Sequence, residues 1–211
     1  FLHSVKFPYT VGYGMTECGP AIAFDHWQTF RPTSCGRAVD RMEIRIDSPD
    51  PFKQVGEILT KGMNVMDGYY NNPEASNTVL SPDGWLHTGD LGVLDPDGYL
   101  YIKGRSKSLI LGPSGQNIYP EEIEDLLNAQ PYIAESLVIE REGKLVALVY
   151  PDAEAMKQNK ISREALLKII HETRKQINQQ IPAYSQIAKV TIYNEEFEKT
   201  PKKSIKRFLY Q

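Results

Sequence analysis

A hydroxyl and a carboxylate stand side by side near the start of this 211-residue chain. Thr16 and Glu17 follow Gly12-Tyr13-Gly14, which the sequence predicts to be a tight turn after a strand ending near Val11. A threonine hydroxyl donates to phosphate oxygens, and a glutamate oxygen suits a hard cation such as Mg²⁺. The alternative is a loop with a capping threonine and a solvated glutamate. Taken alone, the segment favours the plain loop.

A second candidate carboxylate is Asp90, which follows Trp85-Leu86-His87 and Thr88-Gly89. We expect Asp90 just beyond the end of a strand, where a carboxylate can accept both hydroxyls of a ribose. The alternative is an Asx-turn cap, and the local pattern favours it. His87 has no chemical partner visible in the sequence, so we expect its role to be structural.

The run Gly104-Arg105-Ser106-Lys107 separates two parts of the chain with different patterns. Short strands, prolines and turns precede it, whereas helices mixed with strands follow it. A glycine followed by small and charged residues absorbs a backbone rotation at little steric cost, and hinges are often built this way. We therefore predict two domains, 1–104 and 105–211, with a moving boundary. The alternative is an ordinary exposed turn.

Two later stretches suit a ligand. Gly115, in the loop that begins at Gly112, either lets the backbone approach a ligand closely or only makes the turn. The tail KTPKKSIKRFLYQ is strongly basic. Its cationic residues are Lys199, Lys202, Lys203, Lys206 and Arg207. Such a run is usually a solvated face, but at the end of an acidic chain an anionic ligand is worth considering.

The elements that must hold these residues predict an α+β fold. Alternating apolar and charged residues over 42–47, and a glycine-bounded run over 56–62, predict strands of a small barrel or curved sheet. After a short buried strand over 109–111, Pro120 fits the start of one helix, and Ser162 caps a longer helix that reaches about residue 180. Strands are expected over 136–140, 145–150 and 189–193.

The composition and charge of the chain argue against several classes of protein. Lys and Arg number 24 against 27 Asp and Glu, giving a net charge of −3, which argues against a general nucleic-acid binder. No apolar run approaches the roughly 18 residues of a membrane helix, and the first residues do not resemble a signal peptide. Cys18 and Cys35 form no metal-ligand cluster with the histidines. We expect a cytoplasmic location.

Five ordered motifs resemble one family. They are YGMTE at 13–17, GEIL at 56–59 leading to Gly68-Tyr69, WLHTGD at 85–90, the run from Gly104 to Glu124, and the Lys-Thr-Pro tail. Together they resemble the later motifs of the adenylate-forming enzymes, which include acyl-CoA synthetases, luciferases and peptide-synthetase adenylation domains. The run GRSKSLILGPSGQNIYPEEIE looks most like long-chain fatty acid–CoA ligases. The resemblance covers essentially the whole chain.

The resemblance implies both an architecture and a reaction. Residues 1–104 would be the last part of a large domain, including its distorted β-barrel, and 105–211 the small mobile C-terminal domain. The family's glycine-rich phosphate loop and most of its acyl pocket are absent, so we expect a C-terminal fragment that is inactive alone. The implied enzyme joins a fatty acid to ATP with Mg²⁺, giving acyl-adenylate and pyrophosphate, and then passes the acyl group to coenzyme A.

The family's residue roles carry over by motif. Tyr13 would lie against adenine, Thr16 would bind phosphate and Glu17 would hold Mg²⁺. Asp90 would take the ribose hydroxyls, assisted by Arg105.

The resemblance implies three further roles for residues that follow Gly104 in the chain. Lys107 would be the hinge residue, and Gly115 would line the pantetheine tunnel for coenzyme A. The family's tail lysine before an isoleucine is replaced here by Ser204, so Lys203, Lys206 or no lysine acts in adenylation; we favour Lys203.

Two rival functions stay open at this level. The chain can be a non-catalytic docking or dimerisation module, or an adenylating enzyme whose acceptor is a carrier-protein thiol. Peripheral membrane contact through the missing N-terminal part is compatible with the family. Acyl chain length and oligomeric state cannot be read from these residues.

Overall fold

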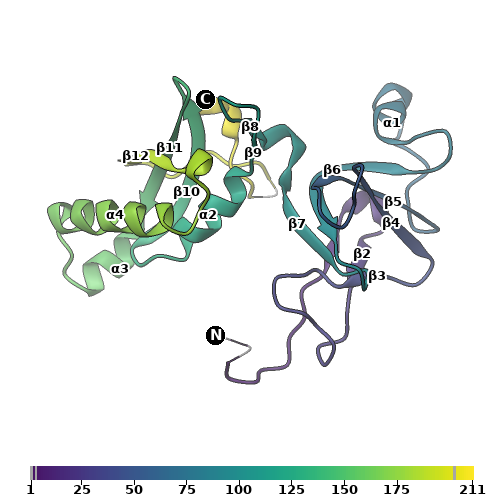
Figure 1. Ribbon diagram of the computed structural model, residues 1–211, viewed down its shortest axis with the longest axis horizontal. Helices are drawn as coiled ribbons and strands as arrows, with labels where there is room; N and C mark the ends of the chain where they lie inside the picture. Colours follow the sequence, from purple (N-terminus) through teal and green to yellow (C-terminus); the bar gives the residue numbers. More distant parts are fainter. Residues whose placement is uncertain (1, 3, 202) are drawn as a thin grey trace. The chain divides into compact units, whose positions relative to one another are not determined.

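The computed structural model describes residues 2, 4–201 and 203–211. The chain forms two compact units, Phe1–Lys107 and Ser108–Gln211. The first is rich in strands, and the second combines helices with a sheet (Figure 1). The predicted α+β fold is therefore confirmed. Strand β7 (Leu100–Arg105) keeps Gly104 and Arg105 within the first unit.

The first unit contains two antiparallel sheets. The smaller sheet consists of β1 (Tyr13–Gly14), β2 (Ala21–Phe24) and β3 (Arg37–Ala38). The larger consists, in spatial order, of β4 (Met42–Asp47), β5 (Gly56–Gly62), β6 (Leu86–Leu94) and β7. Helix α1 (Pro73–Val79) precedes β6, and Asn72 caps it by accepting from the Ala75 amide. The predicted strands over 42–47 and 56–62 are confirmed.

Two expectations about this unit are wrong. The strand near the start of the chain is Tyr13–Gly14 itself, not a segment ending at Val11. Gly14 permits this pairing because a Cβ there would lie 2.1 Å from the Pro20 carbonyl oxygen. Asp90 also lies inside β6 rather than beyond a strand end. Gly89 adopts a φ of 72°, which only glycine reaches without strain, so the strand continues through an apparent turn signal.

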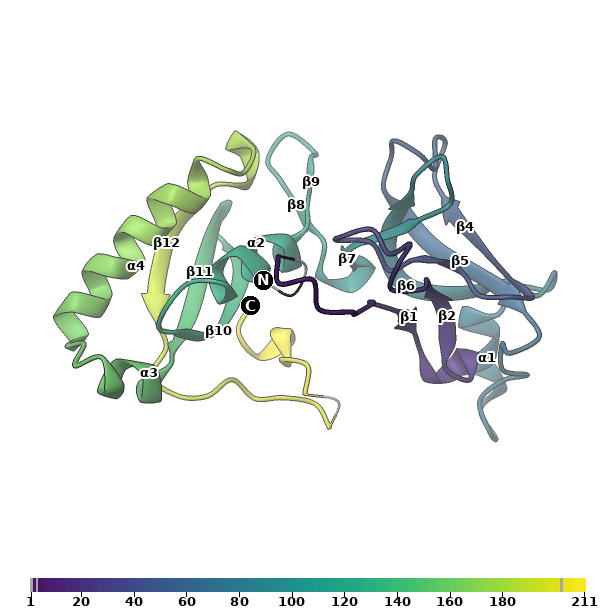
Figure 2. The ribbon, with the colours of Figure 1, turned by 90° about the horizontal axis from the view of Figure 1, so that it is seen from below.

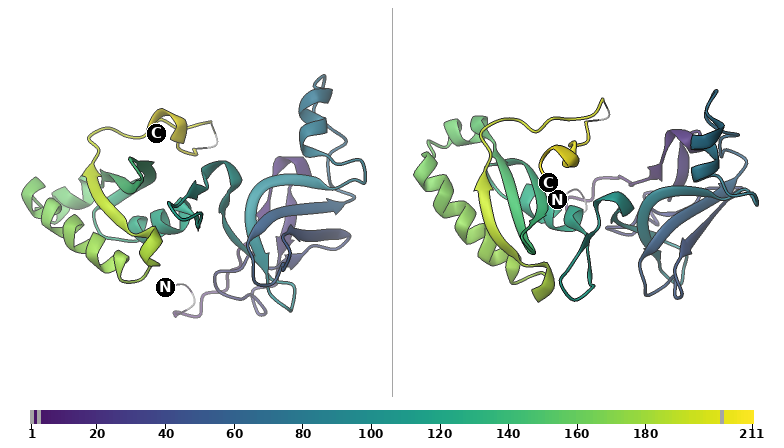
Figure 3. Two further views of the ribbon diagram at one scale, coloured as in Figure 1. Left: turned by 45° about the horizontal axis from the view of Figure 1, so that its top comes forward. Right: turned by 90° about the horizontal axis from the view of Figure 1, so that it is seen from above.

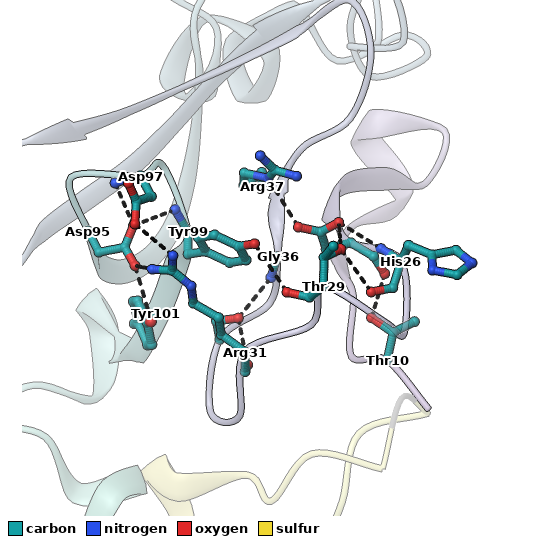
Figure 4. A network of polar contacts seen from close by, with 12 residues as sticks. Thr10, His26, Thr29, Arg31, Gly36, Arg37, Asp95, Asp97, Tyr99 and Tyr101 are labelled. Atoms are coloured by element: carbon teal, nitrogen blue, oxygen red, sulfur yellow. Dashed lines mark hydrogen bonds and ion pairs between the residues drawn. The ribbon is translucent and has the colours of Figure 1, made fainter. Parts of the chain in front are cut away.

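The hairpin between β6 and β7 is fastened by one arginine (Figure 4). A turn at 95–98 connects the two strands, and in it the Gly98 amide donates to the Asp95 carbonyl at 2.9 Å. Arg31 pairs with Asp95 and with Asp97 at 2.6 Å each. Its guanidinium also lies 4.1 Å from the centre of the Tyr99 ring. The loop between β2 and β3 is thereby held against the hairpin that carries β7.

The larger of the two sheets in the second unit is covered on both faces. Strands β10 (Ile133–Arg141) and β11 (Lys144–Pro151) form an antiparallel hairpin, and β12 (Ile187–Ile192) pairs parallel to β11. The helices are α2 (Pro120–Asn128), α3 (Ala153–Gln158) and α4 (Arg163–Asn178). Helix α4 lies along the sheet, and the C-terminal tail crosses the opposite side (Figures 2 and 3).

Each face of this sheet has its own apolar core. Leu127 of α2 and Ile170 of α4 pack with Val138 and Val149 on one face. On the other, Phe197 of the tail packs with strand residues such as Leu148, and it stacks on Tyr193 with ring centroids 5.2 Å apart. The tail is therefore part of the folded unit.

Local signals set most boundaries here. The helix starts predicted at Pro120 and Ser162 are confirmed, and the Ser162 hydroxyl accepts from the Ala165 amide at 3.1 Å. The short strand predicted over 109–111 exists as β8 (Ile110–Leu111), paired with β9 (Asn117–Ile118), but it is not buried, because Leu111 is 68% exposed. Within the described residues, no helix has the length and apolarity required to cross a bilayer.

Candidate functional site

Three residues named from sequence meet in the first unit. The Tyr13 hydroxyl of β1 donates to Asp90 Oδ2 at 2.7 Å. Arg105 Nε, at the end of β7, lies 3.1 Å from Asp90 Oδ1. Asp90 itself is buried, at 8% exposure, whereas the arginine is largely exposed. The cluster joins both sheets of the unit around one carboxylate.

The electrostatics of this cluster keep a donor and an acceptor in fixed roles. Burial, and then the charge of Asp90, raises the pKa of Tyr13 well above its ordinary value. The phenol therefore stays protonated and donates. Each oxygen of an ionised carboxylate has two acceptor positions, so Asp90 can accept further hydroxyl donors beside its two present partners.

Thr16 and Glu17 lie in a 3₁₀ helix (Thr16–Cys18) directly after β1. Glu17 Oε1 accepts from the Tyr69 hydroxyl at 3.0 Å. Thr16 is exposed, and its hydroxyl makes no hydrogen bond within the part of the chain that the structure describes. The sequence did not assign a role to Tyr69, although it lies in one of the five motifs.

These residues bear on how a magnesium ion would be held. Among residues 2, 4–201 and 203–211, no group of three or more His, Cys, Asp or Glu side chains is arranged to hold a metal. Mg²⁺ commonly takes one or two carboxylates and fills its other positions with water and substrate phosphates. The single half-buried Glu17 carboxylate fits that pattern.

A second polar pair was missed from the sequence. His87 Nδ1 lies 2.9 Å from Glu57 Oε2, and the Gly89 amide donates to Glu57 Oε1 at 2.9 Å. The partner of His87 comes from β5, thirty residues earlier in the chain. Only the pairing of β5 with β6 brings them together, so no local pattern could have revealed the contact.

Lys107 and Gly115 lie on opposite sides of the division between the units. Lys107 is exposed in a 3₁₀ helix (Ser106–Ser108) that follows β7. Gly115 lies in the loop between β8 and β9 with a φ of 79° and open space where a side chain would project. A cavity of about 490 Å³ adjoins this loop, and Ser114, Lys144 and Tyr184 are among its lining residues.

The basic tail forms a small hairpin whose tip carries Lys203. Lys199 and Ile205 form an antiparallel bridge, and the Lys203 amide donates to the Thr200 carbonyl at 2.8 Å. Lys203 is exposed and has a φ of 62°. Lys202 lies outside the described residues.

The neighbouring lysines are ion-paired. Lys199 pairs with Glu135 at 2.7 Å and also with Glu196. Lys206 pairs with Glu198 at 3.2 Å. Within the described part of the chain, Lys203 has no such partner.

Arg207 anchors the hairpin to the body of the second unit. It pairs closely with Glu124 of α2 and donates to the Val138 carbonyl of β10 at 3.1 Å. Glu124 Oε1 accepts from the Val138 amide at 2.6 Å. Burial raises the pKa of Glu124 to about 7, against the opposing influence of Arg207. Neither anchor residue was singled out from sequence as a partner of the other.

Comparison with known proteins places this geometry in a family. The model for the AMP-binding enzyme matches residues 3–70, and the model for the AMP-binding enzyme C-terminal domain matches residues 107–210. The 4-coumarate–CoA ligase 5 of Oryza sativa subsp. japonica is 40% identical over 138 residues, covering 61% of this chain and 25% of the relative. A long-chain-fatty-acid–CoA ligase of Gallus gallus is 37% identical over 150 residues, covering 71% and 20%.

A solved structure agrees over the whole chain. The O-succinylbenzoate coenzyme A synthetase of Bacillus subtilis, in complex with AMP, superposes with a TM-score of 0.79 at 28% identity, covering 100% of this chain and 42% of that one. The chain belongs to the AMP-binding enzyme superfamily, in its acyl-CoA synthetase family. It spans less than half the length of the relatives described here.

Proposed function

We propose that this chain is part of an acyl-CoA ligase. The enzyme would join a carboxylic acid to ATP, forming a mixed anhydride with AMP and releasing pyrophosphate, and coenzyme A would then displace AMP. The cluster of Tyr13, Asp90 and Arg105 is the observation that carries the proposal. It presents a buried carboxylate with spare acceptor positions, as a ribose diol requires.

In this proposal the first unit holds the nucleotide. Tyr13 lies against the adenine ring and fixes Asp90 through its hydroxyl. Asp90 accepts the ribose hydroxyls, and the exposed guanidinium of Arg105 remains near enough to assist. Support comes from the AMP complex of the synthetase with the similar fold.

The phosphate chain would be met by the residues after β1. The free hydroxyl of Thr16 donates to a phosphate oxygen, and Glu17, oriented by Tyr69, is the carboxylate available for Mg²⁺. When bound, this ion would neutralise charge on the phosphates. Both side chains would act by holding the phosphates and the ion in place, because positioning is the main requirement of phosphoryl and adenylyl transfer.

Lys203 is the residue that we propose for stabilising charge during adenylation. Its neighbours Lys199 and Lys206 are held in ion pairs, whereas Lys203 projects from an anchored hairpin. An ammonium group at this tip can approach an oxyanion as a compact point charge. Ser204, at the position where the family has its lysine, cannot supply that charge.

Lys107 and Gly115 would serve the second half-reaction. We propose that rotation at Lys107 changes which face of the small domain meets the active site. The Gly115 loop would then line the passage for pantetheine. The adjoining cavity supports this role, since it offers Lys144 for a phosphate and Tyr184 for a flat ring.

The acid substrate is proposed to be a long-chain fatty acid. Support comes from the sequence of the run from Gly104 to Glu124 and from the 37% identity with a long-chain-fatty-acid–CoA ligase. The other relatives are ligases for 4-coumarate and O-succinylbenzoate, which makes aromatic acids the main rivals. We expect the 211-residue chain to make no acyl-adenylate alone, because it lacks the family's glycine-rich phosphate loop.

The decisive experiment measures pyrophosphate release by the longer protein that contains this chain. Palmitate, 4-coumarate and O-succinylbenzoate would be compared as substrates, with coenzyme A or a carrier-protein thiol as acceptor. Lys203→Ala should slow adenylation by about a hundredfold, the scale for losing one charged stabiliser of a transition state. Thioester formation from supplied acyl-adenylate should change little.

Lys206→Ala is the matched control, because it removes the same charge three residues away. Normal adenylation by Lys203→Ala together with loss in Lys206→Ala would move the role to Lys206. If neither matters, the basic tail is only a solvated surface. If none of the acids in the panel leads to pyrophosphate release, the result would contradict the ligase proposal itself.

A further inference from the structure

A second polar cavity lies in the first unit, next to the Tyr13–Asp90–Arg105 cluster. It encloses about 370 Å³ between the end of α1, strands β5 and β6, and the corner that follows β7. Its lining includes Glu57, His87, Arg105 and Lys107. Tyr13 and Asp90 do not line it, so of the proposed ribose contacts only Arg105 belongs to this cavity.

The carboxylate in this cavity is already satisfied. Glu57 accepts from the Gly89 amide through one oxygen and lies 2.9 Å from His87 Nδ1 through the other. An ionised carboxylate can only accept, so Nδ1 must carry the proton. The other ring nitrogen, Nε2, then carries a lone pair and accepts a hydrogen bond in the neutral ring, whereas it donates one in the charged ring.

The remaining charged groups of the cavity are cationic. Lys107 has no ion-pair partner within the described residues, and its side chain is exposed. Arg105 places Nε against Asp90, which leaves its terminal nitrogens for another acceptor. The hydroxyls nearby are committed, because Ser106 donates to the Gly89 carbonyl at 3.1 Å and Thr78 to the Ala75 carbonyl at 2.7 Å.

We propose that this cavity binds an anion of the phosphate class. Lys107 and Arg105 would hold it, with His87 Nε2 as a third polar group in the cavity. Glu57 from β5 and Asp90 beside Arg105 oppose the anion, whereas α1 contributes no charged lining residue. The two cations offset the two carboxylates, and the cavity adds polar groups that can meet an anion. Arg105 is shared with the proposed ribose contacts, whereas Lys107 and His87 are not among the proposed nucleotide contacts.

The test titrates inorganic phosphate into the ¹⁵N-labelled 211-residue chain at one pH, with chloride holding the ionic strength constant. Phosphate should shift the His87 ring nitrogens and the Gly89 amide, because both residues line the cavity. Lys107→Ala should weaken binding by about fivefold, the scale of one exposed ion pair.

Two further variants separate a built site from general attraction. Lys53→Ala removes the same charge from an exposed lysine that pairs with Asp50, away from the cavity, and should leave phosphate binding unchanged. His87→Asn keeps a donor toward Glu57 but lacks the outer ring nitrogen, and should weaken phosphate binding. If that variant misfolds, the exposed Lys107→Ala still decides.

AMP distinguishes a free phosphate site from the phosphate of the bound nucleotide. Saturating AMP should shift the Tyr13 signals and leave the phosphate-induced shift at His87 in place, because Lys107 and His87 are not among the proposed nucleotide contacts. The proposal is overturned if AMP displaces phosphate or if phosphate shifts only residues near Thr16. It is also overturned if the Lys53 and Lys107 variants weaken binding equally.

Discussion

Replacing Tyr13 by phenylalanine removes the single oxygen that joins β1 to the buried carboxylate of β6. The lost hydrogen bond measures 2.7 Å and ends on Asp90, which is 8% exposed. Hydrogen bonds to charged groups contribute roughly 1.5–3 kcal/mol, and Tyr13 is only partly exposed, so we expect the free energy of unfolding of the first unit to fall by about 2 kcal/mol.

The two tryptophans make this loss measurable in one unit. Trp27 and Trp85 both lie in the first unit, so their fluorescence follows its unfolding in urea. With a slope of about 2 kcal/mol per molar urea, the fluorescence midpoint should fall by about 1 M. Circular dichroism at 222 nm is dominated by α4 and its neighbours in the second unit and should change far less.

Tyr184→Phe is the matched control, because Tyr184 is 46% exposed and lies in the second unit. It should leave the fluorescence midpoint in place. A Tyr13→Phe midpoint within about 0.2 M of the parent chain would refute the reasoning, since it would mean that water replaces the phenol at no cost. Combining Tyr13→Phe with Asp90→Asn should give less than the sum of the two losses, because both changes remove the same bond.

Two further outcomes follow from the second unit. Carbon-13 NMR should find the Glu124 carboxyl titrating at about pH 7. Because the folded pKa lies above the unfolded value of 4.5, the unit should lose stability as the pH rises from 4.5 to 7. Glu124→Gln should flatten that slope, and a titration midpoint near pH 4.5 would contradict the burial argument. Limited trypsin digestion should cut after Arg105 or Lys107 and leave a resistant product that begins near Ser108; protection there, with cleavage inside 120–180, would contradict the two-unit division.

Local chemistry made the second unit largely readable from sequence. Ser162 supplies a side-chain cap, and Leu166, Ile170 and Ile177 recur at helical spacing, so α4 follows from signals within a few residues. The β10–β11 hairpin is likewise set by the turn at 141–143. Nearest-neighbour preferences and tertiary packing agree in these elements.

Long-range pairing explains what the sequence did not reveal. Gly89 and Asp90 have the composition of a turn, yet β5 and β7 pair on both sides and hold them inside β6. Glu57 and His87 likewise meet only through this sheet. The motif resemblance named the residues of the candidate site, but it did not show that Tyr13 and Arg105 approach the same carboxylate from two different strands.

The anchored tail also bears on how this protein can change over evolutionary time. Its hairpin is fixed at one end by Phe197 in the core and at the other by Arg207, so the exposed residues 203 and 204 add little to the packing. A tip that is supported from both ends can exchange its side chains without unfolding the domain. Selection can therefore exchange side chains at this tip, and a library randomised over positions 203 and 204 should yield variants that share one melting temperature.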